Sequence, residues 1–213
     1  MCIRDRNADK SYLDELHMRG AAVIRSLTVE HVTETNVARA FEELETDTLV
    51  IKPKVGGGAW RQVLYKKGDP FPDEETLPPE GALIQPFLPS VLTEGEYSFL
   101  YFGGRFSHAA RRTPKAGDYR IQSIYGGAEE TYTPSQAERG HARAILDVLD
   151  ETPLYARVDL LRGLDGTLKL IELECIEPYL YLPHAKGEGG KNEGAQNFAM
   201  ALVARLEAAK AAR

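Results

Sequence analysis

Four charged side chains alternate with apolar residues in two short runs of the sequence. Arg157 and Asp159 lie two residues apart in the first run, and Glu172 and Glu174 lie two residues apart in the second. The sequence GLDG at residues 163–166 separates the runs and supplies tight-turn residues, so the segment predicts a β-hairpin. Residues two apart in a strand share a face, which places Arg157 beside Asp159 and Glu172 beside Glu174.

The same alternation predicts how the apolar residues of the second strand are distributed. Leu168 and Leu170 should share the acidic face. The opposite face should carry Ile171, Leu173 and Cys175. Both faces are then largely buried, and buried carboxylates are unfavourable unless positive charge compensates them. The alternative is a hairpin at the solvent edge with scattered acids.

Two kinds of positive charge could compensate these acids. One is the guanidinium of Arg157, and the other is a hard divalent cation. Three oxygen donors with no histidine or cysteine beside them suit Mg²⁺ better than Zn²⁺. If a cation compensates the acids, rather than Arg157 alone, replacing Asp159 by asparagine should leave the metal-free fold intact.

The spacing of these residues resembles a known pattern. R-x-D, twelve residues and then E-x-E-x-x-x-P is similar to the metal-binding hairpin of ATP-grasp ligases. Bacterial glutathione synthetase and D-alanine–D-alanine ligase carry asparagine where this sequence has Glu174, and the pattern is most similar to the branch with the cycloserine-forming cyclo-ligase. The resemblance implies that Asp159, Glu172 and Glu174 bind Mg²⁺, with Mn²⁺ as an alternative. It also implies that Arg157 stabilises an acyl-phosphate and the oxyanion of a tetrahedral intermediate.

Composition and charge exclude several classes of protein. The chain has 213 residues and a formal net charge of −6, and no basic stripe is evident, which argues against a nucleic-acid surface. No apolar run approaches the ~18 residues of a membrane span, and the start lacks the apolar core of a signal peptide. The two cysteines form no recognisable motif. We therefore expect a cytoplasmic protein that binds neither nucleic acid nor a membrane, and a homo-oligomer remains open.

The first residues differ in character from the rest. MCIRDR resembles translated adapter sequence at the ends of metagenomic reading frames. We therefore interpret residues 1–7 as a foreign or disordered start, and we expect the natural protein to begin earlier.

Two lysines and a glycine run could hold phosphate groups. The sequence LVIKP at residues 49–53 predicts a strand that ends just after Lys52. The glycine run follows it at Gly56, Gly57 and Gly58. Glycines let backbone N–H groups approach an anion closely, although no G-K-[ST] follows, so this is not a Walker motif. The family resemblance implies a mobile lid over ATP, with Lys52 and Lys10 on its phosphates.

A second strand is predicted at residues 82–88, with the sequence ALIQPFL. Pro86 removes one backbone donor, so this strand should be irregular or lie at an edge. In the family, the corresponding Q-x-F-L segment is the hinge between two subdomains, and its backbone reads the adenine edge. The resemblance implies ATP contacts at Gln85, Pro86, Phe87 and Leu88.

Two further segments match family patterns in the expected order. EGEYS at residues 94–98 resembles the segment whose acid binds the ribose hydroxyls, which implies Glu96, with Glu94 as the alternative. RRTPKAGDYRIQSIYGG resembles the R-x-P…R…GG segment of glutathione synthetase, in which an arginine meets the phosphates and the acyl-phosphate. Arg120 fits that position, and Arg112 is a weaker candidate near substrate or phosphate.

The ordered set of segments implies an α+β ATP-grasp fold, with two subdomains that each contain a mainly antiparallel sheet flanked by helices and bind ATP between them. We expect a smaller subdomain with the lid at residues 8–88 and a larger one with the metal-binding hairpin at 89–213. The implied function is ATP- and Mg²⁺-dependent ligation of small carboxylate and amine substrates, intermolecular or cyclising, through an acyl-phosphate. The alternative is a nucleotide-binding module of the same fold without ligase activity.

Overall fold

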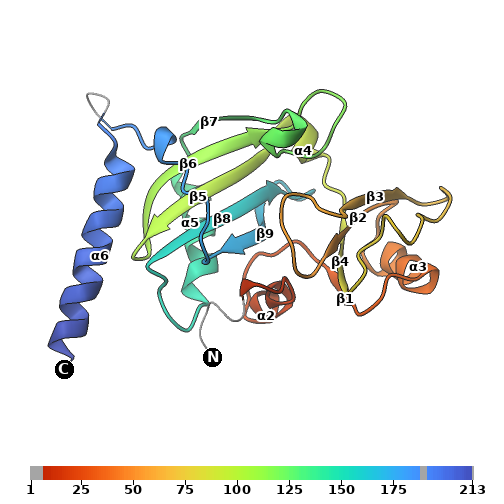
Figure 1. The fold of residues 1–213 in the computed structure, drawn as a ribbon, viewed down its shortest axis with the longest axis horizontal. Coiled ribbons are helices and arrows are strands. Elements are labelled where there is room, and N and C mark those ends of the chain that lie inside the picture. Colours follow the sequence, from red (N-terminus) through yellow and green to blue (C-terminus); the bar gives the residue numbers. More distant parts are fainter. Residues whose placement is uncertain (1–6, 188–190, 213) are drawn as a thin grey trace.

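The computed structural model describes residues 7–187 and 191–212. Two antiparallel sheets lie next to each other with helices against them, as Figure 1 shows, and this arrangement confirms the predicted α+β class. Within the described residues, we find no helix with the length and apolar character needed to cross a membrane.

The smaller sheet has the strand order β1-β4-β2-β3, and neighbouring strands in it are antiparallel. Its strands are β1 (Leu27–Val29), β2 (Thr48–Pro53), β3 (Val63–Lys66) and β4 (Ala82–Pro86). Helix α3 (Glu34–Glu43) packs on this sheet, and it begins where the Thr33 hydroxyl accepts a hydrogen bond from the Asn36 amide. The helix and the strands share one apolar core: Val37, Ala40, Phe41, Leu49, Ile51 and Ile84.

The sequence predicted that the strand containing Pro86 would be irregular or lie at an edge, and it does not lie at an edge. Strand β4 lies inside the sheet, between β1 and β2. However, β1 pairs only with residues 82–84, and Pro86 lies beyond its end, opposite Leu49 of β2. The missing N–H group therefore interrupts no pairing with β1, which is why an interior strand tolerates the proline.

The larger sheet has the strand order β7-β6-β5-β8-β9, and it is also antiparallel. Its strands are β5 (Glu96–Phe102), β6 (Arg105–Thr113), β7 (Ala128–Tyr132), β8 (Tyr155–Arg162) and β9 (Leu168–Glu174). Helix α5 (Gln136–Asp147) packs on it, and a capping box between Ser135 and Glu138 fixes where this helix begins. Buried Ile145 joins the helix to the core of the sheet.

Helix α2 (Tyr12–Met18) packs against the larger sheet, although it precedes the smaller one in sequence. The Tyr12 hydroxyl donates to the Leu173 carbonyl at 3.1 Å and accepts from the Leu173 amide at 2.7 Å. Helix α2 thus belongs by its packing to the larger unit. The division at residues 88 and 89 stays a prediction.

The start of the described chain is bonded to the same strand. Asn7 falls within the segment expected to be foreign or disordered. Its side chain nevertheless accepts a hydrogen bond from the Cys175 amide at 2.6 Å and donates to the Leu173 carbonyl. Residues 1–6 of that segment lie outside the described residues.

A β-bulge in the hairpin of β8 and β9 changes which residues share a face. Asp159 pairs with Glu172, but the register shifts by one before Leu170, which leaves Ile171 as the extra residue of β9. A one-residue shift reverses the alternation of side chains. The prediction that Leu168 and Leu170 share the acidic face was therefore wrong. Both lie in the main core, and Ile171 lies on the cleft side with Glu172.

Helix α6 (Glu193–Ala211) lies beside the end of the larger sheet, at the left of Figure 1, and Arg205 Nη2 donates to the Thr152 carbonyl at 2.6 Å. It touches the larger sheet near its first turns, where the rings of Phe198 and Phe102 lie 5.3 Å apart. Three short elements complete the described chain: α4 (Ser90–Thr93), η1 (Ser123–Tyr125) and η2 (Leu182–His184).

Candidate active site

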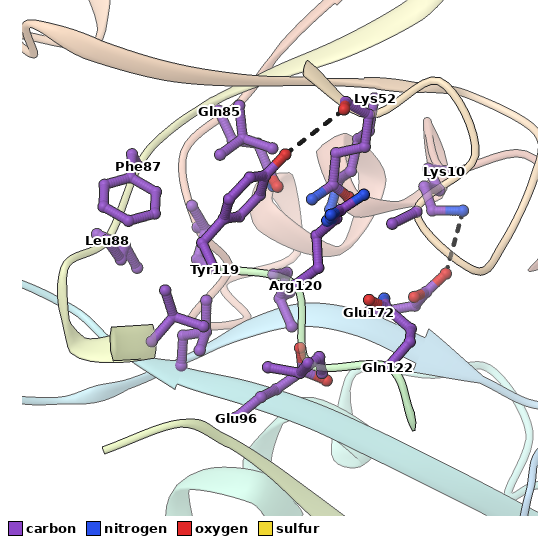
Figure 2. Close-up of a pocket in the computed structure, with 18 of the residues that line it drawn as sticks. Lys10, Lys52, Gln85, Phe87, Leu88, Glu96, Tyr119, Arg120, Gln122 and Glu172 are labelled. Atoms are coloured by element: carbon purple, nitrogen blue, oxygen red, sulfur yellow. Dashed lines mark hydrogen bonds and ion pairs between the residues drawn. The ribbon is translucent and has the colours of Figure 1, made fainter. Parts of the chain in front are cut away.

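A cleft lies between the two sheets and is drawn in Figure 2. About 900 Å³ of space lies between its walls, and this volume includes open solvent. The residues that the sequence assigned to ATP all line it: Lys10, Lys52, Gly56, Gly57, Gly58, Gln85, Pro86, Phe87, Leu88 and Glu96. Arg120 and Glu172 line it as well. The structure thus brings together residues that are up to 162 positions apart in sequence (Lys10 and Glu172).

One end of the cleft is apolar. Its walls are a buried cluster with partly buried side chains against it: Ile24, Leu88, Val91, Ile121, Leu161, Phe87, Tyr119 and Ile171. The hinge segment is fixed to the smaller sheet, because the Phe87 amide donates to the Thr48 carbonyl at 2.8 Å. The Gln85 side chain is also held, by a 2.8 Å hydrogen bond from its Nε2 to Ser26 Oγ. An ordered apolar slot of this kind suits a flat aromatic ring.

Positive charge gathers at the other end of the cleft. Lys52 is buried near the end of β2, and burial lowers the pKa of its ammonium group to about 8 even though nearby acids attract it. Arg120 extends from the opposite wall toward Lys52 (Figure 2). Its Nη2 lies 2.7 Å from Asp118 Oδ2, and its Cζ lies 3.7 Å from the centre of the Tyr125 ring. Two cations that face each other beside a glycine loop favour a polyphosphate ligand.

The glycine loop is contacted from both sides of the cleft. Lys10 Nζ donates to the Gly56 carbonyl at 2.6 Å. From the opposite wall, the Tyr125 hydroxyl donates to the Gly58 carbonyl at 3.4 Å. The loop therefore lies over the cleft, as expected of a lid between two strands of the smaller sheet.

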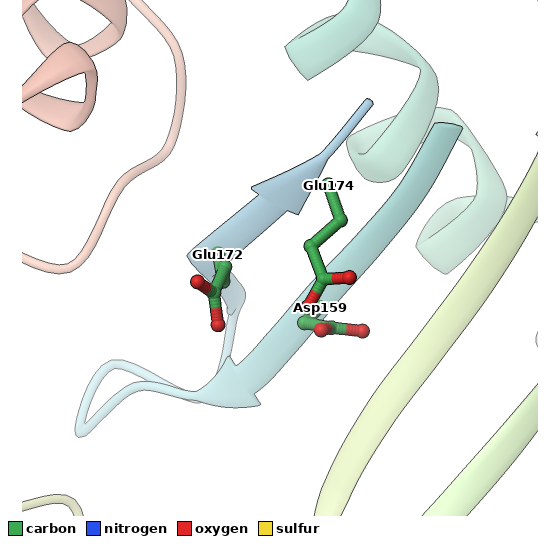
Figure 3. A group of neighbouring side chains, drawn as sticks. All are labelled: Asp159, Glu172 and Glu174. Atoms are coloured by element: carbon green, nitrogen blue, oxygen red, sulfur yellow. The ribbon is translucent and has the colours of Figure 1, made fainter. Parts of the chain in front are cut away.

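The three hairpin acids converge beside this positively charged end. Asp159, Glu172 and Glu174 each offer an oxygen atom within 4.8 Å of those of the other two. Figure 3 shows their positions on β8 and β9. Carboxylate oxygens at this spacing fit a hard cation such as Mg²⁺ or Mn²⁺. Burial raises the pKa of Glu174 to about 7 although Arg157 lies against it, so this group is short of positive charge in the metal-free protein.

Asp159 is the most enclosed of the three, with 1% of its surface exposed. Arg157 donates to it through Nε at 3.0 Å and Nη2 at 2.9 Å, and Ser98 Oγ donates at 2.6 Å. Arg112 Nη2 lies 3.2 Å from Asp159 Oδ2. Burial would raise the pKa of Asp159, but the two guanidiniums outweigh it and hold the pKa below its ordinary value. Arginine compensation is therefore already present without a cation, and the structure predicts a loss of stability for asparagine at Asp159.

Glu96 lies at the start of β5 and is paired with Arg112, whose Nη2 donates to Glu96 Oε1. Burial raises the pKa of Glu96 to about 7 in spite of this pairing. Gly95 lets the backbone before β5 lie close to the Arg112 backbone of β6, because it has φ +84° and a Cβ there would collide with the Arg112 carbonyl oxygen. Glu94, the alternative candidate, is bonded instead to Arg162 Nε at 2.6 Å. Of the two acids, Glu96 is the one in the cleft.

Comparison with known proteins gives relatives of one kind, although no family model matches the chain. The chain is 28% identical over 216 residues to the cycloserine biosynthesis protein DcsG of Streptomyces lavendulae. This alignment covers 93% of the chain and 70% of DcsG. It is 31% identical over 145 residues to glutathione synthetase of Prochlorococcus marinus, which covers 61% of this chain and 46% of that protein. The chain therefore spans less than half of this second relative.

Solved structures agree with these similarities. The crystal structure of the D-cycloserine synthetase DcsG matches with a TM-score of 0.80 and 26% identity, over 96% of this chain and 72% of that one. The ATP-grasp ligase PsnB matches with a TM-score of 0.64 and 18% identity, over 93% and 61% of the two chains. The chain has the fold of the ATP-grasp ligases. This confirms the fold that the ordered motifs predicted, and it agrees with their resemblance to that family.

Several residues around the hairpin acids were not assigned from the sequence to the roles they have in the structure. Ser98 follows Glu96 by two positions on β5, so strand alternation could have placed it on the same face. The Tyr181 ring lies 5.6 Å from Arg112 Cζ and 5.7 Å from Arg157 Cζ. It lies outside the strands, where no alternation marks it. Arg112 was assigned to substrate or phosphate, whereas one of its Nη atoms is engaged by Glu96 and Asp159.

Proposed function

We propose that this protein is an ATP- and Mg²⁺-dependent ligase that joins a carboxylate to an amine. One observation carries the proposal: a single cleft combines an apolar slot with two facing cations beside a glycine loop, and Glu172 on its wall belongs to a cluster of three carboxylates. These features would hold adenine, polyphosphate and a divalent cation respectively. The relatives, among them a glutathione synthetase and a D-cycloserine synthetase, support the same class of reaction.

In the proposed reaction, a substrate carboxylate oxygen attacks the γ-phosphorus of ATP and ADP leaves. The amine then attacks the carbonyl carbon of the acyl-phosphate, phosphate departs with the C–O bonding pair, and the amine loses a proton. Lys52 and Arg120 would hold the transferring phosphoryl group, and Arg157 would stabilise the oxyanion. No side-chain nucleophile is needed, because positioning and charge stabilisation supply the rate.

Asp159, Glu172 and Glu174 are the residues that would hold the cation. When bound, Mg²⁺ neutralises the charge that the phosphate oxygens carry. Glu96 would accept the ribose hydroxyls, and the backbone of residues 85–88 would meet the adenine edge. These assignments rest on the position of each residue in the cleft and on the resemblance of its segment to the family pattern.

An ADP-release assay tests the ligase. The protein is assayed with ATP and Mg²⁺ against a panel of carboxylate and amine pairs, including amino acids that carry a second nitrogen and could cyclise. Arg120→Met should abolish release, while Arg25→Met, an exposed arginine outside the cleft, should not change it. Nucleotide should also raise the melting temperature, because it binds only the folded state. A melting shift without ADP release for any pair would support the nucleotide-binding module without ligase activity. If the protein shows no melting shift and no ADP release, both the ligase and the nucleotide-binding module are contradicted.

A further inference from the structure

The ammonium group of Lys10 contacts two parts of the cleft at once. Its Nζ lies 3.1 Å from Glu172 Oε1, on the hairpin of β8 and β9. The same atom donates to the Gly56 carbonyl of the lid at 2.6 Å. Lys10 is only 7% exposed, and Figure 2 shows the dashed contact that joins it to Glu172. One charge therefore joins the lid to a carboxylate of the acid cluster.

The backbone fixes this position. The Lys10 amide donates to the Lys54 carbonyl at 2.8 Å, just after the last residue of β2. Two residues later, Tyr12 is bonded to both the amide and the carbonyl of Leu173, which follows Glu172 directly. The chain from Lys10 to Tyr12 thus connects the base of the lid to β9. The contact between Lys10 and Glu172 is consequently built into the fold.

The hairpin acids have different cationic partners. Asp159 is bonded to Arg157 and Arg112 and is 1% exposed, so its partners are fixed in the core. Glu172 is more open, because 32% of its side-chain surface is exposed, and its ion pair is with Lys10. A lysine ammonium is a compact charge on a flexible stem, whereas an arginine fork is tied to one geometry. Lys10 is accordingly the cation that can exchange partners.

From this geometry we infer that Lys10 takes the place of the divalent cation on Glu172 while the cleft holds no nucleotide. The inference rests on the proposed function. A divalent cation that arrives alone must compete with the ammonium charge at Glu172 and is repelled by it. Polyphosphate offers the ammonium group a new partner and releases Glu172. The cation is therefore bound together with nucleotide, and free cation does not accumulate in the acid cluster.

The test measures Mn²⁺ binding without nucleotide, by electron paramagnetic resonance of free Mn²⁺ and by calorimetry. Lys10→Met removes the competing charge and should tighten Mn²⁺ binding about tenfold, the effect expected when one hydrogen bond to a charged group no longer has to be broken. Lys54→Met is the matched control: its ammonium pairs with Asp9 at 3.6 Å and Glu30 at 3.3 Å, outside the cleft, and should leave Mn²⁺ affinity unchanged.

Two further variants keep the test decisive. Lys10→Gln keeps a donor for the Gly56 carbonyl without the charge, and it should also tighten Mn²⁺ binding, which covers the case in which Lys10→Met does not fold. Adding Glu172→Gln to either variant should cancel the gain. Equal or weaker Mn²⁺ binding by the folded Lys10 variants would overturn the inference. Binding of Mn²⁺ with ADP to the unmodified protein is measured separately, and its absence would count against the proposed function instead.

Discussion

The two walls of the cleft hold charge in different ways. On the larger sheet, which we call the arginine wall, arginines form ion pairs with carboxylates. Arg157 donates to Asp159 through two nitrogen atoms, and Arg112 lies between Asp159 and Glu96. On the other wall, which we call the lysine wall, Lys10 and Lys52 present single ammonium groups beside a glycine loop. The arginines are paired with acids of their own wall, whereas Lys10 reaches across to Glu172 and Lys52 lines the cleft.

This contrast separates a fixed part of the site from an adaptable one. A guanidinium fork that meets a buried carboxylate fixes the orientation of both groups. A lysine on a flexible stem can follow a phosphate as the lid moves. The four predictions below, ordered from the largest expected effect to the smallest, test whether the two walls behave in these two ways.

The arginine wall should be essential to the metal-free fold. Asp159→Asn leaves two buried guanidiniums under-compensated, so the free energy of unfolding should fall by about 3–5 kcal/mol. Asp147→Asn is the control, because its pair with Arg143 is exposed and such pairs contribute ~1 kcal/mol or less. Urea unfolding of both variants without metal measures the difference. A stable Asp159→Asn protein would show that the arginines do not depend on this carboxylate.

The lysine wall should matter to ligand and little to fold. Lys52→Ala removes a charge aimed at phosphate, so affinity for Mg-ADP should fall roughly 10- to 100-fold, the value of one hydrogen bond to a charged group. The unfolding free energy without ligand should stay equal or rise, because a buried ammonium no longer has to be desolvated. Calorimetric titration measures the affinity. Lys66→Ala, at an exposed position of β3, should bind Mg-ADP as the unmodified protein does.

Nucleotide affinity should weaken above pH 8, because burial lowers the pKa of Lys52 to about 8 in the ligand-free protein. The neutral amine must then take up a proton on binding, which calorimetry in buffers of different ionisation enthalpy detects. The pH dependence of folding stability has the opposite sign to that of nucleotide affinity. The unfolded chain holds this proton up to its pKa of 10.5, so the contribution of Lys52 to stability rises between about pH 8 and 10.5. Lys52→Arg should remove both effects, and persistence of the affinity loss in that variant would point to another group.

The smallest effect is expected at Glu174, where the arginine wall is least complete. Glu174→Asn should change the unfolding free energy by about 1 kcal/mol or less at neutral pH, because Arg157 retains its ion pair with Asp159. Burial raises the pKa of Glu174 to about 7, so the folded protein keeps a proton that the unfolded chain has lost above about pH 4.5. The contribution of Glu174 to the free energy of unfolding therefore falls as the pH rises from about 4.5 to 7. In Glu174→Asn, this pH-dependent fall should be absent. ADP release should persist with an altered Mg²⁺ requirement, whereas its complete loss would make Glu174 indispensable.

Most of the site could be predicted because its motifs are short and local. The hairpins, the lid and the hinge each occupy a few consecutive residues, and their order along the chain identified the fold. The faces of the strands were harder. From the turn that pairs Phe102 with Arg105, simple counting places Arg111 opposite Glu96. The structure has Arg112 there, because the register shifts between Leu100 and Tyr101.

A second bulge acts in the same way in the hairpin of β8 and β9. Counting from the pair of Arg162 and Leu168 places Ile171 opposite Asp159, whereas the structure has Glu172 there. Both bulges move a charged residue into the site, and alternation along a strand gives no sign of either. Tyr181 lies outside the strands, and sequence periodicity misses it for a different reason: only the tertiary fold brings it to Arg112 and Arg157.

The lid carries one more feature of practical value. Trp60 is the only tryptophan of the chain, and it lies at the cleft next to the glycine loop, 52% exposed. Indole emission shifts with the polarity of its surroundings. The protein therefore contains a built-in optical reporter, with no other indole to obscure it. A change in its emission spectrum on adding a ligand would follow the lid directly, in the unmodified chain and without any label.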